Sequence, residues 1–329
     1  MDTEIDNPLN ENMETITSIN SMSTIDSFNN SGVIPMVSSN SHENLNSPQI
    51  NGIIFFDFLS NNSQDFLRFS FEYANEIYKN LLTDEKNLYL KPLYGYMKKQ
   101  SHINEKMRAI LIDWIIDIHF RFNLRLQSLY ITVMIIDTSL SKKEIKRSEF
   151  QLLGLTALVI ACKAEEVQCP QLKDLVSLTD GACDIDSLIK MESDILILLN
   201  YNVCVPTAFD FYGILAKGFK FNSLQTNLGL YFMEYTLYDY NMIKYPASVI
   251  AAATCYFVMK FFGVGDYKKL YSSSFVNDDF PQKVIKEAAR ELCFLVQNLR
   301  NNEEFRVLRE KYALEKYDRV SEYLNSICN

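Results

Sequence analysis

The first 67 residues contain no lysine and no arginine, although they carry nine acidic residues. Residues 68–329 hold 32 acidic and 32 basic residues, so the first segment accounts for the whole net charge of −9. A nucleic-acid-binding protein needs a basic face that displaces counterions from phosphates. The neutral charge of residues 68–329 therefore argues against DNA or RNA as a partner.

The signatures of catalysis and of metal binding are also missing. Three histidines, His42, His102 and His119, do not stand at metal-ligand spacing, and the ten glycines form no phosphate-binding loop. No G-x-S-x-G or H-E-x-x-H motif occurs. Glu165 and Glu166 are adjacent carboxylates, but neighbouring positions on a helix point apart. We expect no catalytic residue, no cofactor and no metal.

Long apolar runs and paired cysteines are absent as well. No run reaches the length that spans a bilayer, and the acidic N-terminus lacks the apolar core of a signal peptide. We therefore expect no membrane association. The seven cysteines include no C-x-x-C pair and mostly fall in apolar runs, which predicts buried, reduced thiols in an intracellular protein.

The chain does contain dense helical periodicity, and it is organised around residues 152–166, LLGLTALVIACKAEE. The first ten of these are apolar or small on every side of a helical wheel, which is typical of a buried helix. The helix then ends in charge at Lys163 and Glu165. No sustained alternation at period two indicates strands, so we expect an all-α protein.

Composition and breaks divide the chain into four parts. Residues 1–64 form an acidic tail, rich in Asn and Ser, that we expect to be disordered. Residues 65–103 hold a lone amphipathic helix and a linker, and residues 104–205 and 206–321 form two helical units separated by Pro206. The helices expected up to that break are 68–82, 104–121 (N-cap Asn104), 127–141, 148–166 (N-cap Ser148), 171–178 and 185–200.

The second unit repeats the first with an offset of 97 residues. At this offset TALVIACK (156–163) lies over ATCYFVMK (253–260), and SLYITVMIID (128–137) lies over QTNLGLYFME (225–234). An offset of one domain length indicates duplication and not a solenoid. The sequence therefore predicts two similar five-helix bundles in tandem, with a second apolar helix over about 246–261.

The helix at 104–121 has two apolar faces. Ile112 and Ile115 lie on one side of the wheel, and a second arc of about 120° gathers Met107, Ile110, Leu111, Trp114 and Asp117. One apolar face suffices for the core of a bundle. The second face is either buried as well or is an exposed docking patch centred on the single tryptophan of the chain.

The helical pattern also predicts two pairs of opposite charges. Arg108 faces the Ile112 side, and a buried arginine needs a partner; Asp137, at the end of the next apolar helix, is the candidate. Lys163 and Glu192 stand at the edge of an apolar surface. They form either a local salt bridge or a donor and an acceptor for the backbone of another protein.

Met107–Trp114, MRAILIDW, closely resembles the opening of the cyclin box, and the resemblance continues through Ala161–Glu166, Met191-Glu192 and Pro206-Thr207. In the second unit, residues 236–253 and 311–321 resemble the C-terminal box of mitotic, B-type cyclins. The resemblance covers about residues 68–321 and implies two tandem cyclin boxes. It implies a non-catalytic subunit of the nucleus and cytoplasm that binds and activates a mitotic Ser/Thr cyclin-dependent kinase at the G2/M transition.

The same resemblance assigns roles to individual residues. Its kinase-binding positions fall on Lys163, Glu192, Glu165 and Tyr201. Its docking patch for RxL-bearing substrates or inhibitors falls on Met107, Ile110, Leu111, Trp114, Asp117 and Gln151, which favours the exposed interpretation of the second face. Arg108 and Asp137 fall on its buried structural pair. Two alternatives remain open: the core of a cyclin-fold transcription factor associated with nucleic acid, and an enzyme.

The chain departs from the family pattern at three places. The family usually reads DRFL where this chain has Asp137-Thr138-Ser139-Leu140. It usually has a kinase-contacting aromatic before the two glutamates, where this chain has Ala164. Residues 1–67 contain neither of the destruction signals RxxL and KEN, which does not support turnover by the usual route.

Overall fold

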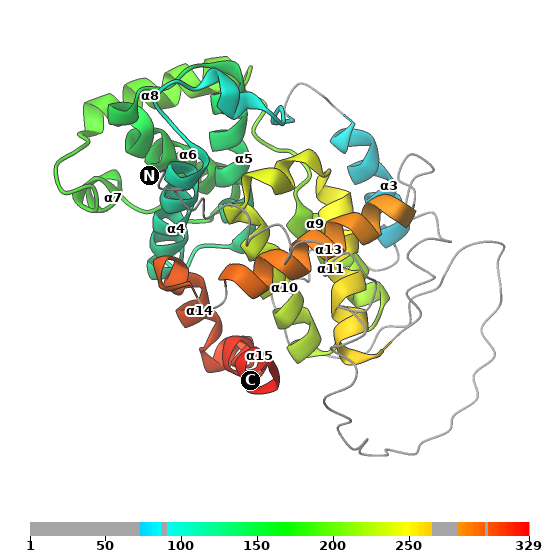
Figure 1. Ribbon diagram of the computed structural model, residues 1–329. Coiled ribbons are helices and arrows are strands. Elements are labelled where there is room, and N and C mark those ends of the chain that lie inside the picture. The colour runs from blue at the N-terminus through cyan, green and yellow to red at the C-terminus, as the bar shows by residue number, and fades with distance from the viewer. Residues whose placement is uncertain (1–72, 87–90, 265–281, 300–301, 329) are drawn as a thin grey trace, which may run out of the picture.

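We describe the fold from a computed structural model, which defines residues 73–86, 91–264, 282–299 and 302–328. Every regular element in these ranges is an α-helix or a short 3₁₀ turn, which confirms the all-α prediction. The helices form two bundles side by side (Figure 1). The tail at 1–64 and the first residues of the expected helix at 68–82 lie outside the described residues.

The first bundle is built around α6 (Phe150–Glu165), the apolar helix of the sequence analysis. Ten successive residues, Leu153–Cys162, are buried, and α4, α5, α7 and α8 pack on it. Those four helices are α4 (Glu105–Arg121), α5 (Leu126–Lys142), α7 (Leu172–Ser177) and α8 (Ile185–Leu198). Gly154 allows α4 to pack closely, because a Cβ at this position would stand 2.8 Å from Cδ1 of Leu111.

Two predicted helix caps have different outcomes. Asn104 caps α4 as expected, since its side chain accepts a hydrogen bond of 2.9 Å from the Met107 amide. The prediction that Ser148 caps the central helix is wrong. Residues Arg147–Glu149 instead form a 3₁₀ turn, and α6 begins after it at Phe150.

The second bundle repeats the first and is built around α11 (Ala247–Phe262). Both ends of α11 lie 97 residues after those of α6, so the offset read from the sequence is the offset of the structure. Three helices of the described ranges pack on α11: α9 (Ala208–Gly218), α10 (Ser223–Tyr238) and α13 (Gln282–Leu299). The chain continues through α14 (Arg306–Tyr312) and α15 (Val320–Cys328), and α14 packs against α4 of the first bundle (Figure 1).

The helix α3 (Ala74–Glu85) precedes both bundles and packs against α9 of the second one. It ends three residues beyond the predicted limit of 82. The reason is a tertiary contact: the Glu85 carboxylate accepts hydrogen bonds from the amide (2.8 Å) and the hydroxyl (2.5 Å) of Ser248 at the start of α11. A carboxylate stabilises the free amides at a helix N-terminus, although burial raises the pKa of Glu85 above its usual value.

Candidate functional site

Lys163 and Glu192 form an ion pair on the surface of the first bundle. Lys163 is the last basic residue of α6, and its Nζ lies 2.6 Å and 2.8 Å from the two Glu192 carboxylate oxygens on α8. The lysine side chain is 49% exposed and that of Glu192 13% exposed. The two residues thus present a charged donor and acceptor at the surface where the last turn of α6 meets the middle of α8.

Exposed apolar side chains stand close to this pair along the chain. Ile189 stands one turn before Glu192 on α8 and is 50% exposed, and Val167, just after α6, is 87% exposed. Tyr201, predicted from the resemblance to bind the kinase, is 68% exposed and has a left-handed backbone with φ 56°. A charged pair within exposed apolar side chains is typical of a protein-binding surface.

Glu165 and Glu166 differ in their environment. The Glu166 carboxylate accepts hydrogen bonds from the Arg125 amide at 2.7 Å and from the Ser128 hydroxyl at 2.6 Å, at the first turn of α5. Glu165 is half-buried, and its backbone carbonyl accepts a hydrogen bond from the Arg125 side chain. Glu166 thus connects the end of α6 to the start of α5 by hydrogen bonds and stabilises the position of the segment that carries Lys163. No local pattern in the sequence indicated this role of Glu166.

The predicted docking patch is partly exposed. Ile110 is 52% exposed, and Met107, Trp114, Asp117 and Gln151 are half-buried, the first four on α4 and Gln151 on α6. Leu111 does not fit the expectation of an exposed patch: it is only 6% exposed, because α6 closes over it at Gly154. The patch is therefore a shallow apolar surface with Leu111 as its floor. The Ile112 face of α4 is buried, whereas the second face of α4 is partly exposed.

Asp117 supplies the negative charge of this surface. Its carboxylate lies 2.8 Å from the guanidinium of Arg121, one turn later on α4, and the Arg121 side chain is 62% exposed. Exposed pairs at this spacing are weak, about 0.3–0.5 kcal/mol. Opening this pair therefore costs little free energy.

Arg108 and Asp137 are brought together as the helix pattern predicted. Nε and Nη2 of Arg108 donate to the two Asp137 oxygens at 2.7 Å and 2.8 Å, and both side chains are buried. Burial acts to lower the pKa of Arg108, but Asp137 raises it above its ordinary value. The Tyr96 hydroxyl donates to the same carboxylate at 2.8 Å.

The Arg108 pair also joins the two bundles, which the sequence did not reveal. Its Nη1 donates to the carbonyls of Leu237 at 2.9 Å and Tyr238 at 3.2 Å, in the last turn of α10. These carbonyls have no partner within their own helix, and a cation is favourable at a helix C-terminus. Nearby, the Tyr238 hydroxyl donates to Asp113 of α4 at 2.9 Å, and burial raises the pKa of Asp113 to about 6.

A second buried ion pair holds the C-terminal helices. Lys311 on α14 lies 2.7 Å and 2.8 Å from the two Glu234 oxygens on α10, and the Tyr312 hydroxyl donates to the same carboxylate. Burial lowers the pKa of Lys311, and Glu234 opposes that effect. This pair was also missed, because its partners are 77 residues apart and nothing in their local sequence links them.

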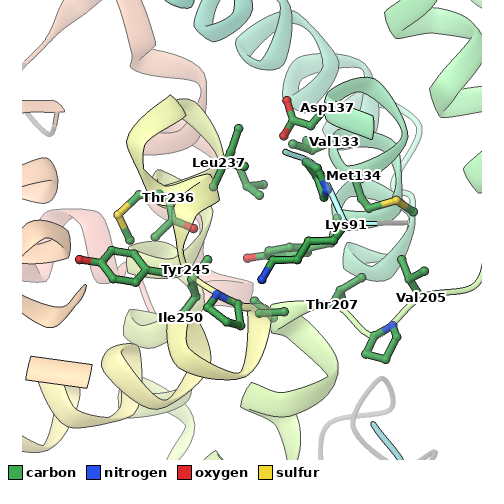
Figure 2. A pocket seen from close by; sticks show the side chains of 18 of the residues that line it. Lys91, Val133, Met134, Asp137, Val205, Thr207, Thr236, Leu237, Tyr245 and Ile250 are labelled. Carbon is green, nitrogen blue, oxygen red and sulfur yellow. The ribbon is translucent and has the colours of Figure 1, made fainter. Parts of the chain in front are cut away.

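A cavity of about 170 Å³ lies at the seam between the bundles. Its walls come from α5, from α10 and from the segment that leads into α9. Figure 2 shows Lys91 reaching into this space between Met134 on α5 and Thr236 on α10. The cavity adjoins the Arg108–Asp137 pair, and neither the kinase-binding nor the patch candidates line it, so it is separate from both.

Within the described ranges, no three His, Cys, Asp or Glu side chains gather as metal ligands would. The same ranges contain no helix whose length and apolar character suit a membrane span.

Comparisons with known proteins agree with this architecture. Residues 76–204 match the family described as "Cyclin, N-terminal domain" and residues 206–326 match "Cyclin, C-terminal domain". The viral cyclin from herpesvirus saimiri has a similar solved structure, with a TM-score of 0.52 and 19% identity, covering 75% of this chain and 99% of the viral one. At that identity the likeness shows the fold alone.

Two curated relatives are similar in sequence. Cyclin-B2-1 of Oryza sativa subsp. japonica is 40% identical over 185 residues, which is 56% of this chain and 44% of the rice protein. The G2/mitotic-specific cyclin-B of Hydra vulgaris is 34% identical over 252 residues, 76% of this chain and 67% of that protein. The chain therefore spans less than half of the rice relative and about two thirds of the Hydra relative. Two matched domains in tandem and relatives of this kind show that the chain belongs to the cyclin family, with B-type, G2/mitotic cyclins among its relatives.

Proposed function

We propose that this chain binds and allosterically activates a mitotic Ser/Thr cyclin-dependent kinase and, through the α4 patch, docks RxL-bearing substrates or inhibitors. Membership of the cyclin family supports the proposal, as do relatives named G2/mitotic-specific cyclins. The observation that carries it is the Lys163–Glu192 pair, which joins the last turn of α6 to the middle of α8 and leaves the lysine side chain 49% exposed.

The proposed mechanism is a shift of population. A protein kinase is active when the glutamate of its C-helix pairs with the lysine that orients the nucleotide. A partner that binds this inward state more tightly than the outward state shifts the equilibrium by its differential affinity. Moving a kinase from 1% to 99% active takes about 5.5 kcal/mol of that difference. The cyclin needs no catalytic group of its own.

The chemistry of the pair suits this task. The Lys163 ammonium has three N–H donors, and Glu192 occupies some of them while leaving the lysine side chain 49% exposed. A surface ion pair is worth at most about 1 kcal/mol, so opening it for a partner costs little. Hydrogen bonds from charged groups to a partner backbone contribute about 1.5–3 kcal/mol each. The pair therefore has more to gain from a kinase backbone than it loses.

The docking of RxL peptides would use the α4 patch. Ile110, Trp114 and the floor at Leu111 offer an apolar surface for the leucine of the motif. Asp117 offers a carboxylate for its arginine, in exchange for the weak contact with Arg121. With this activity we propose the cellular location implied by the resemblance, nucleus and cytoplasm, which imaging of a fluorescent fusion tests.

The proposed function is tested by titrating a purified mitotic cyclin-dependent kinase with the full chain. We expect Lys163→Ala to weaken binding about tenfold, the loss of one charge-assisted hydrogen bond, and to reduce activation at subsaturating concentration. Lys283→Ala is the matched control, since this lysine is exposed on α13 of the second bundle. Wild-type binding and activation by Lys163→Ala would refute the proposed interface.

A further inference from the structure

Six exposed basic side chains gather at one end of the first bundle. They come from two segments of the chain, one just before α4 and one that runs from the last residue of α5 towards α6. We call these six residues the basic patch: Lys98, Lys99, Lys142, Lys143, Lys146 and Arg147.

Hydrogen bonds hold the two segments of the basic patch side by side. The buried Gln100 side chain donates from Nε2 to the Lys143 carbonyl at 2.8 Å and accepts at Oε1 from the Ile145 amide at 3.0 Å. Next to it, the hydroxyl and the amide of Ser101 both donate to the Glu144 carboxylate. The fold therefore fixes the position of the backbone that carries these charges.

The positive charge of the basic patch is not neutralised locally. In the described part of the chain, no carboxylate comes within ion-pair distance of Lys98, Lys99, Lys143, Lys146 or Arg147. Lys142 donates to the Leu198 carbonyl at 3.5 Å, which leaves its charge in place. Like charges gathered on one surface attract an acidic ligand.

The chain contains an acidic ligand of its own. Residues 1–67, which we call the acidic segment, carry nine acidic residues and no lysine or arginine, and they lie outside the described residues. A segment of this length reaches about 220 Å when extended, more than the diameter of about 50 Å of a body of this size. Because the segment is tethered, its effective concentration is of millimolar order, so a contact with Kd of about 1 mM is half occupied.

Nucleic acid fits the basic patch less well. Glu144 and Glu149 stand between and beside its basic residues in the sequence, and carboxylates repel a phosphate backbone. Residues 68–329 as a whole are neutral. The acidic segment, with its charge of −9, also competes with phosphates from a tethered position.

We propose that the acidic segment binds the basic patch of the same chain. The patch lies at the start of α6, since Phe150 follows Arg147 by three residues. Lys163 stands 13 residues further along α6, which is about 20 Å along the helix axis. The contact therefore leaves the kinase-binding candidates uncovered, and the proposal does not rest on the proposed function.

The test is carbodiimide cross-linking of the full chain, which joins a carboxylate to a lysine in contact with it, followed by mass spectrometry. At about 10 mM salt, where charges act over about 30 Å, we expect the acidic segment to cross-link to Lys98, Lys99 and Lys143 about tenfold more than to Lys283. At about 1 M salt, where charges act over about 3 Å, this preference should disappear. Lys283 is the control because it is exposed on α13 of the second bundle.

A pair of charge-matched variants provides a second measurement. Nuclear magnetic resonance of the labelled full chain should show the same change in the signals of residues 1–67 when salt is raised and when the patch is neutralised by Lys98→Gln/Lys99→Gln/Lys146→Gln/Arg147→Gln. The control variant removes as many exposed positive charges elsewhere and should leave those signals unchanged: Lys173→Gln/Lys220→Gln/Lys283→Gln/Arg290→Gln.

Three results would overturn the proposal. The first is equal cross-linking of the patch lysines and Lys283, or tail signals that respond equally to both variants. The second is cross-linking between chains instead of within one, which a mixture of isotopically light and heavy chains detects. The third is displacement of the acidic segment by an equimolar short DNA duplex at about 0.15 M salt, because the patch would then be a nucleic-acid site.

Discussion

Removing one partner of the Arg108–Asp137 pair should strongly destabilise the protein. The two side chains are 1% and 5% exposed, so Arg108→Met leaves a carboxylate buried. Among the described residues, the Tyr96 hydroxyl is then its only hydrogen-bond partner from a side chain. Breaking a buried pair in this way costs about 3–5 kcal/mol. That is a large part of the 5–15 kcal/mol that holds a typical domain folded, and we expect the Tm to fall by about 10 °C.

A double-mutant cycle separates the pair from its surroundings. Asp137→Leu alone should cost a similar amount, because it leaves the guanidinium without its counter-ion and the Tyr96 hydroxyl unpaired. The double variant Arg108→Met/Asp137→Leu removes both charges and should cost about 3 kcal/mol less than the sum of the single changes. Denaturant unfolding with a shared m-value measures all four free energies of unfolding.

The double variant should still be less stable than the wild type. It leaves the carbonyls of Leu237 and Tyr238 without their donor from Arg108, so the hydrogen bonds that Arg108 makes between the two bundles are lost. Additive single effects would refute the buried-pair reasoning. A double variant as stable as the wild type would refute the role of Arg108 in joining the bundles.

Three further predictions concern the surface and a buried histidine. Ala164→Phe should tighten kinase binding about tenfold, measured by titration, because Ala164 is exposed beside Lys163 and an aromatic ring adds apolar area to the contact; unchanged affinity would mean that the kinase does not reach this position. Ile110→Ser should slow phosphorylation of RxL-bearing substrates and spare short peptides that lack RxL, and equal loss on both would place Ile110 outside a docking site; Trp114 is less suitable because it packs against the core. Burial lowers the pKa of His119 to about 3. The contribution of His119 to stability is therefore present above its unfolded pKa near 6.5 and is lost as the pH falls. From pH 7.5 to 5.5 the free energy of unfolding should decrease by about 1.4 kcal/mol. His119→Gln should remove that decrease in pH-dependent unfolding, and an unchanged pH dependence would contradict the assignment.

The periodic parts of the fold were predictable from the sequence. The apolar helix α6, its repeat α11 at an offset of 97 residues, and the Asn104 cap all follow from local patterns. The Arg108–Asp137 pair could also be predicted from the sequence, because a charge on an apolar helix face requires a partner. These features depend on residue spacing along one helix, or on the requirement that a buried charge has a partner of opposite charge.

The features that escaped prediction depend on contacts between distant segments. Glu85 extends α3 because it meets Ser248, 163 residues away, and Glu166 binds the start of α5. The Lys311–Glu234 pair joins helices that the sequence places 77 residues apart. Leu111 is buried because Gly154 admits its side chain, which a wheel of one helix does not show. No local pattern carries this information.

The central claim is that the chain reshapes the active site of a kinase and performs no chemistry itself. The most direct measurement is the rate at which a mitotic cyclin-dependent kinase phosphorylates a short peptide without RxL, as the concentration of this chain is raised. The account predicts a rate that rises to saturation, that falls when Lys163→Ala replaces the wild-type chain at a subsaturating concentration, and that is zero without the kinase. A rate independent of this chain, or phosphorylation by the chain alone, would contradict it.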